Sequence, residues 1–183
     1  MSMGGVRFLR RVRGREATST STPWLFIKTL IQSSILWFVF LLILPLVIFR
    51  LEDLLELDRF RFGNPNLKAI SVLLFVTASG LAIASYVVMV LKGRGTPAPF
   101  DCPSKLVVEG PYRYVRNPMA VSGIIQGISV ALFLGSPLVL IYVGAGLVIA
   151  ETIIRPWEED DLERRFGQAY VTYRNSVRRW FPR

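Results

Sequence analysis

Polar side chains suited to binding an anion or a polar ligand gather directly before an apolar segment. The stretch EGPYRYVRNPMAVSG, residues 109–123, holds Tyr112, Arg113, Tyr114, Arg116 and Asn117. An arginine fork binds a carboxylate or phosphate through two parallel bonds, and an aromatic ring stacks on a cation or a flat heterocycle. A proline, which suits the first turn of a helix, follows the cluster. We therefore expect these groups to lie at the mouth of an apolar helix.

A second charged cluster follows the last apolar run. Glu151 lies inside apolar sequence, where a carboxylate is costly unless it is paired or hydrated. Arg155 lies one turn later, so an i,i+4 pair with Glu151 is expected, and a plain ion pair at the membrane boundary is one reading of it. Glu158 and Glu159 come next. A tight turn at Gly135 would return both clusters to one membrane face, and such convergence is what a ligand site needs.

The elements that must position these clusters are apolar helices. The chain has 183 residues, of which 52% are hydrophobic, and its formal net charge is +9. About 20 apolar residues cross the ~30 Å hydrocarbon core, so the first two apolar runs are long enough and the last two are short. We predict an all-α integral membrane protein with about four transmembrane helices, the last two a short helical hairpin, and a C-terminal amphipathic cytoplasmic helix. The apolar runs are residues 24–49, 69–91, 119–134 and 137–154.

The distribution of basic residues predicts the orientation. The three segments richest in bases relative to acids carry five, five and seven bases, whereas the remaining loop, 50–68, carries four bases and four acids. The positive-inside rule then places both termini in the cytoplasm. The compartment predicted is the bacterial inner membrane, with the endoplasmic reticulum as the alternative. The base-rich segments are residues 1–23, 92–118 and 155–183.

The domain organisation follows from these runs. We predict a mobile basic cytoplasmic arm, residues 1–23, and a single membrane domain, residues 24–183. The first half of that domain, 24–91, would hold two transmembrane helices joined by an interfacial loop. In this loop a short amphipathic helix is expected, with Leu51 on its apolar face and Glu52 on its polar face. The second half, 92–183, would hold both polar clusters.

Several kinds of site are excluded by composition. The chain has no histidine, so a histidine-ligated metal and a Ser/His/Asp triad are impossible, and no metal site is predicted. Cys102 is the single cysteine, which excludes a disulfide within the chain. Topology and contact with anionic lipid explain the positive charge, and no nucleic-acid partner is expected because the aromatic residues sit at helix ends or inside apolar runs. The lipid bilayer and a hydrophobic substrate are the expected partners, and the sequence does not say whether the protein binds other proteins.

The polar inventory suits a zwitterionic ligand that also carries hydroxyls and a heterocycle. Arginine would bind its carboxylate, glutamate its ammonium or a ribose diol, and aromatic rings its base, and S-adenosylmethionine has all of these groups. The motifs also resemble a known family. GPYRYVRNPM, an apolar hairpin and EEDDLERRFGQAYVTYRNSVRRWFP together resemble the membrane methyltransferase superfamily of isoprenylcysteine carboxyl methyltransferases and phospholipid N-methyltransferases. The resemblance covers roughly residues 105–183.

The resemblance implies a site and its roles. Family members bind S-adenosylmethionine between the hairpin and the C-terminal helix, and their lipid substrate enters from the membrane. Two positions depart from the carboxyl methyltransferase pattern, since Asn117 stands where histidine is usual and Ala120 where an aromatic is common. Asn-Pro-Met is closer to the phospholipid methyltransferase version. The implied cofactor-binding residues are Gly110, Tyr112, Arg116, Asn117, Pro118, Glu158 and Glu159. The candidate catalytic residues are Arg116, Asn117 and Glu151, and the candidate substrate residues are Arg113 and Met119.

The predicted activity is S-adenosylmethionine-dependent methyl transfer to a lipid or other hydrophobic small molecule. Methyl transfer from a sulfonium depends on positioning and desolvation, so it needs no histidine. A carboxylate acceptor would need only an orienting cation such as Arg113 or Arg116. An amine acceptor would have to lose a proton, for which Glu109 or Glu151 is the candidate base. Two alternatives stay open: a membrane reductase with a nicotinamide cofactor, and a non-catalytic binding or assembly module with the same fold.

Overall fold

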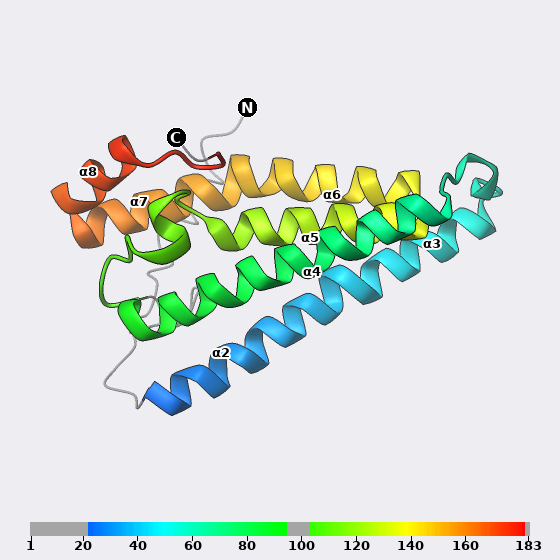
Figure 1. Ribbon diagram of the computed structural model, residues 1–183. Helices are drawn as coiled ribbons and strands as arrows, with labels where there is room; N and C mark the ends of the chain where they lie inside the picture. Colours follow the sequence, from blue (N-terminus) through cyan, green and yellow to red (C-terminus); the bar gives the residue numbers. More distant parts are fainter. Residues whose placement is uncertain (1–21, 95–102, 182–183) are drawn as a thin grey trace.

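The computed structural model describes residues 22–94 and 103–181, and all regular elements in these ranges are helical (Figure 1). The all-α prediction is confirmed. The predicted basic arm, 1–23, lies outside the described residues except for its last two, which begin the first helix. Cys102 also lies outside them.

The helices join into four runs with continuous helical backbone. The first consists of α2 (Thr22–Trp37), η1 (Phe38–Ile43) and α3 (Leu44–Leu54), and the second of α4 (Pro65–Val88) and η3 (Met89–Gly93). The third is α5 (Pro118–Leu134), and the fourth consists of α6 (Pro137–Ile149), η5 (Ala150–Ile154) and α7 (Arg155–Phe166). Short helices η2 (Asp58–Phe60) and η4 (Gly110–Arg113) lie in the connections, and α8 (Gln168–Ser176) ends the series.

Three of these runs are long and apolar enough to cross a membrane, with 29, 29 and 30 residues. The integral-membrane prediction is thereby confirmed. The third run, α5, is shorter: at about 1.5 Å per residue its 17 residues extend roughly 26 Å. A full crossing by α5 stays a prediction.

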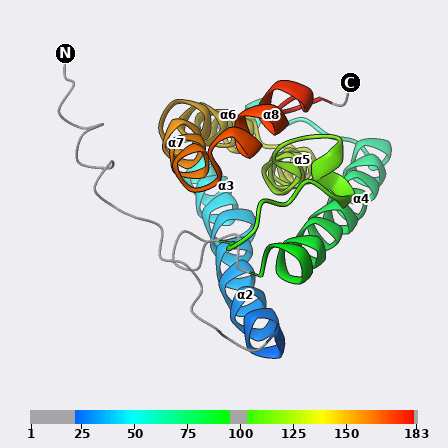
Figure 2. The ribbon, with the colours of Figure 1, turned by 90° about the vertical axis from the view of Figure 1, so that its left-hand side faces the viewer.

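Small buried side chains hold the helices together. The buried residues of α4 are two serines and two alanines, and those of α5 include Gly127 and two serines. Small residues allow helix backbones to approach closely where no hydrophobic effect drives association. Gln126, fully buried on α5, donates a 2.9 Å bond from Nε2 to Ser79 Oγ on α4. Figure 2 shows α4 and α5 side by side, with α6 and α7 on the other side of α5.

The hairpin between α5 and α6 turns at Gly135, as predicted. Gly135 has φ +65°, and a Cβ at this position would lie 1.7 Å from the Phe62 carbonyl oxygen, so a side chain cannot be placed there. The Phe62 amide donates a 2.9 Å bond to the Gly135 carbonyl. The next residue, Ser136, caps α6 by accepting a bond from the Val139 amide. The loop after α3 is therefore fixed to the hairpin turn.

The start of that loop differs from the expectation. No separate amphipathic helix forms, because the first run itself continues to Leu54, and Glu52 points inward with 1% of its surface exposed. Its carboxylate accepts bonds from Ser136 Oγ at 2.6 Å, the Leu138 amide at 3.0 Å and Arg61 Nε at 3.0 Å. A buried carboxylate is tolerated when its charge is paired and its oxygens are bonded. Arg61 supplies the opposite charge, and the hairpin turn supplies the two other donors.

The fourth run passes through Pro156 without ending. Proline cannot donate to the helical ladder and crowds the preceding turn. The widened π-turn of η5 precedes it, with the Arg155 amide bonded to the Ala150 carbonyl, so the helix continues into α7 (Figure 1). The helix then breaks at Gly167, whose φ is +54°. The amphipathic C-terminal segment is consequently divided into α7 and α8.

Candidate functional site

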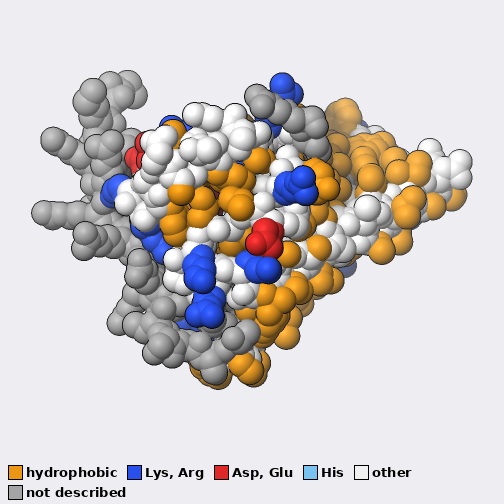
Figure 3. Space-filling view, turned by 60° about the vertical axis from the view of Figure 1, so that its left-hand side comes forward, with side chains coloured by type: hydrophobic (Ala, Val, Ile, Leu, Met, Phe, Trp, Pro, Cys, Tyr) orange, Lys and Arg blue, Asp and Glu red, His pale blue; other side chains and the backbone are white. Residues whose placement is uncertain are grey.

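A cavity of about 560 Å³ lies where α5 begins and α7 meets α8. Pockets of roughly 300–1,000 Å³ hold small ligands. Its polar part is lined by five basic and three acidic side chains, and its apolar part includes Met89, Met119, Ile153 and Ile154. Figure 3 shows basic side chains on this end of the molecule, next to hydrophobic side chains that extend along the helices. The cavity thus joins a charged end to an apolar wall.

The first helical turn of α5 is held by Asn117. This residue is the N-cap, and its Oδ1 accepts a 2.9 Å bond from the Ala120 amide. Pro118 follows at the first helical position and is buried. Asn117 and Met119 line the cavity, whereas Pro118 does not. Asparagine is among the best N-cap residues, so a structural role explains why this position can carry it instead of histidine.

Tyr112, in η4, is the buried tyrosine of the first cluster. Its side chain lines the cavity with 5% of the residue exposed, and its hydroxyl is buried without a hydrogen-bond partner. Burial, with a smaller contribution from the Glu158 charge, raises the pKa of the Tyr112 phenol, which stays neutral and can both donate and accept. Tyr173 on α8 donates a 2.6 Å bond to the Tyr112 carbonyl. Helix α8 therefore braces the first cluster.

Two arginines far apart in the sequence meet at Glu159, and one of them also binds Glu151. Arg116 Nη1 and Arg179 Nη2 both donate to Glu159 Oε1, at 2.9 and 2.8 Å, and Arg179 Nη1 donates to Glu151 Oε2 at 2.7 Å. The expected Glu151–Arg155 pair is therefore wrong. Arg155 instead donates to Glu158 Oε2 at 2.9 Å. An arginine from the C-terminal end competes for Glu151 across space, and a sequence-local pairing rule cannot anticipate that.

The remaining predicted residues are placed around the cavity rather than in it. Gly110 has φ +58°, and a Cβ there would lie 2.9 Å from Val88 Cγ2, so its role in the structure is to allow the chain to approach α4. Arg113 is exposed and does not line the cavity, and neither does Glu151, which contacts it through Arg179. Tyr112, Arg116, Asn117, Met119, Glu158 and Glu159 are brought together in the cavity lining.

Several lining residues were missed by sequence reasoning. Arg155 was assigned only to an ion pair with Glu151, and Arg179 belongs to RRWFPR, a basic-aromatic patch typical of the headgroup region. The decisive contact is a backbone bond of 3.0 Å from the Arg116 amide to the Arg178 carbonyl, which brings the C-terminal end back to the cavity. The sequence did contain one signal for this part of the lining, the three-residue spacing of Tyr170 and Tyr173. Both tyrosines are buried on α8 and line the cavity.

The sequence that forms this cavity was compared with models of known protein families. A family model described as phospholipid methyltransferase matches residues 67–169, more than half of the chain, and that range includes most of the charged cavity lining. The chain belongs to the phospholipid methyltransferase family. A search of curated proteins found no match. The resemblance to the superfamily of isoprenylcysteine carboxyl and phospholipid methyltransferases is confirmed, and the family is one of membrane methyltransferases.

Proposed function

We propose that this protein transfers a methyl group from S-adenosylmethionine to a lipid or other hydrophobic small molecule, at the cytoplasmic face of the membrane. The observation that carries the proposal is a cavity lined by both charged motifs at one end and by apolar side chains from three helical runs at the other. A water-soluble donor and a membrane-soluble acceptor need such a shared space. Family members generally use S-adenosylmethionine.

The polar atoms around the cavity fit this cofactor. The Tyr112 hydroxyl, Arg116 Nε and Arg155 Nε are buried without hydrogen-bond partners. Buried polar groups are nearly always bonded, so these atoms call for ligand or water atoms. A carboxylate and ribose hydroxyls would accept from the arginines, and Glu158 and Glu159 offer oxygens to an ammonium. The bound cofactor would supply a methyl group on a sulfonium, whose leaving group is a neutral thioether.

The protein would contribute orientation and exclusion of water. Met89, Met119 and Ile153 form part of the apolar wall that an acceptor would contact. Holding two reactants in line and dry removes much of the barrier to such a displacement. Arg116, fixed by Glu159, supports the polar end of the site.

The carboxylates that could act as a base differ in their position relative to the cavity. Glu109 is paired with Lys92 at 3.0 Å on the surface and does not line the cavity. Glu151 is held by Arg179. Glu158 is also bonded to a cation, Arg155, but unlike Glu109 and Glu151 it lines the cavity, so it is the better candidate base for an amine acceptor.

Calorimetric titration of the detergent-purified protein with S-adenosylhomocysteine tests the proposal. We expect binding by the wild type and its loss in Glu159→Ala and Arg116→Ala. Lys92→Ala is the matched control, because it removes an exposed ion pair of nearly the same length outside the cavity. No binding by the wild type would contradict the proposal. A nicotinamide cofactor bound in its place would indicate the reductase, and a folded protein that binds neither would indicate the non-catalytic module.

The acceptor is tested separately. Lipids from cells with and without the gene, compared by mass spectrometry, should differ by one methylene in the product, and purified protein with labelled S-adenosylmethionine should transfer the label to that lipid fraction. Label found only in a water-soluble product would contradict a hydrophobic acceptor.

A further inference from the structure

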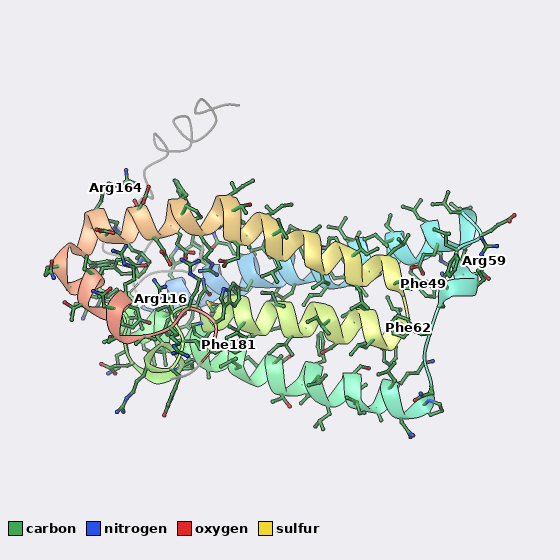
Figure 4. All side chains as sticks on the ribbon, turned by 90° about the horizontal axis from the view of Figure 1, so that it is seen from above. Phe49, Arg59, Phe62, Arg116, Arg164 and Phe181 are labelled. Carbon is green, nitrogen blue, oxygen red and sulfur yellow. The ribbon has the colours of Figure 1, made fainter. Side chains whose placement is uncertain are left out.

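The chain after α8 returns to the cavity. We call residues 177–181 the C-terminal strap. Its Arg178 carbonyl accepts from the Arg116 amide, and the Trp180 ring lies 5.8 Å from Arg155 Cζ. Figure 4 shows Arg116 and Phe181, the last described residue, at the same end of the helix bundle. The strap therefore touches residues of both charged motifs.

Arg179 connects two carboxylates that come from different turns of the fourth helical run. Its guanidinium donates to Glu151 in η5 at 2.7 Å and to Glu159 in α7 at 2.8 Å. The guanidinium is planar and rigid, so two simultaneous bonds fix both carboxylates relative to each other. All three side chains are between 19% and 30% exposed, which reduces screening by solvent and salt.

Glu159 accepts bonds from two arginines through a single oxygen. Arg116 and Arg179 both donate to the same oxygen, Oε1, so the carboxylate is held in one rotamer from two sides and Oε2 takes no part in either bond. Arg179 also lines the cavity, and its Nε is buried without a hydrogen-bond partner. Burial alone would lower the pKa of Arg179, but the bonds to Glu151 and Glu159 outweigh it and raise the pKa.

We propose that Arg179 is a positioning residue: by bridging Glu151 and Glu159 it orients Glu159 toward the cofactor and holds the C-terminal strap against the cavity. This rests on the proposed function, since it assigns Glu159 to cofactor binding. Without Arg179, Glu159 would keep only its bond to Arg116. Glu151 would lose its bond to Arg179, and Arg155 would not replace it because Arg155 is bonded to Glu158.

The test compares Arg179→Gln with a matched control, Arg174→Gln. Arg174 on α8 pairs with Glu163 on α7 at 2.7 Å, so this ion pair also joins the C-terminal part of the chain to α7, but neither residue lines the cavity. By calorimetry on the detergent-purified full chain, Arg179→Gln should weaken S-adenosylhomocysteine binding about ten- to hundredfold, since charge-assisted bonds are lost. Arg174→Gln should leave the affinity within about twofold. Arg179→Lys should restore part of it, because an ammonium lacks the planar fork.

Two further readouts separate positioning from stability alone. Once transfer is measurable, Arg179→Gln should raise the cofactor KM and leave kcat near the wild-type value. The double variant Glu151→Gln/Arg179→Gln should lose less affinity than the sum of the losses in the two single variants, because each single change already breaks the Arg179–Glu151 ion pair.

Several results would overturn the inference. If the wild type binds and Arg179→Gln binds within about twofold of it, or if Arg174→Gln weakens binding equally, Arg179 does not position the site. If the wild type does not bind, the proposed function itself fails. Hydrogen exchange of the ligand-free protein then tests whether Arg179 bridges Glu151 and Glu159. Arg179→Gln must then speed exchange in residues 151–162 as well as 177–181, relative to Arg174→Gln. Unchanged exchange in 151–162 would refute the bridge.

Discussion

At the scale of single residues, the cavity is defined by polar atoms that serve two purposes. Asn117 lines it while capping α5, and Arg116 lines it while binding Glu159. Tyr112 differs, because its hydroxyl is buried without any partner. A substitution at Tyr112 can therefore test ligand binding without the loss of a structural side-chain hydrogen bond.

Tyr112→Phe is such a substitution. Removing a buried, unbonded hydroxyl should leave the stability of the ligand-free protein unchanged or slightly increased. If the hydroxyl binds the cofactor, the affinity for S-adenosylhomocysteine should fall about five- to tenfold, as expected for one lost hydrogen bond. Thermal unfolding and calorimetry measure the two quantities, with exposed Tyr114→Phe as the control. A stability loss with unchanged affinity would show that the hydroxyl serves the fold.

Asn117 allows the opposite comparison. Asn117→Ala removes the N-cap of α5 and should lower the free energy of unfolding by about 0.5–2 kcal/mol. Asn117→Asp and Asn117→Ser keep an acceptor at the same place and should stay close to wild type in thermal unfolding. Equal destabilisation by all three would mean that the amide nitrogen, rather than the cap, is what matters.

The buried tyrosines predict a dependence on alkaline pH. Burial raises the pKa of Tyr112 and of Tyr173 above the ordinary 10.0. In the unfolded chain these phenols lose their protons near pH 10 while the folded protein keeps them, so stability should be flat below about pH 9 and fall above pH 10. The thermal midpoint measured from pH 7 to 11 checks this, and Tyr112→Phe should reduce the fall. A midpoint that does not change through pH 11 would contradict it.

At the scale of elements, the sequence predicted the helices because apolar runs of membrane length have few alternative structures. It also predicted the hairpin, since Gly135 separates two such runs. Arg179 and Glu52 could not be predicted in the same way. Glu52 bonds Ser136 across 84 residues, and Arg179 reaches Glu151 only because the chain reverses at Gly167. Sequence periodicity describes one helix at a time, whereas the partners of Glu52 and Arg179 depend on how distant helices pack together.

Gly135→Ala tests the hairpin. The added Cβ would lie 1.7 Å from the Phe62 carbonyl oxygen at a positive φ, so the turn must deform. We expect a large loss of stability, above about 3 kcal/mol, seen as a poor yield of monodisperse protein in detergent. Gly144→Ala and Gly146→Ala, where a Cβ on α6 meets nothing within 4 Å, should express normally. Normal expression of Gly135→Ala would contradict the close approach of Phe62 to this turn.

At the scale of the whole molecule, the two ends of the helix bundle differ in structure. One end holds the cavity, and the other is closed by the cluster of Glu52, Arg61 and the hairpin turn. Figure 4 shows Arg59, Phe49 and Phe62 at this second end, away from Arg116. Under the proposed function, a methyl donor from the cytosol and an acceptor from the membrane meet only if the cavity end faces the cytoplasm, so the proposal predicts the orientation.

Single-cysteine labelling tests that orientation. In a Cys102→Ser background, Asn175→Cys on α8 and Asp58→Cys in η2 place exposed thiols at opposite ends of the bundle. With a membrane-impermeant maleimide, Asn175→Cys should label in inverted vesicles and Asp58→Cys in right-side-out vesicles, because the base-rich segments stay inside. The reverse pattern would place the cavity on the side without cytosolic S-adenosylmethionine and so contradict the proposed function. Labelling of both from one side would contradict an odd number of crossings by the second, third and fourth helical runs, which lie between the two positions.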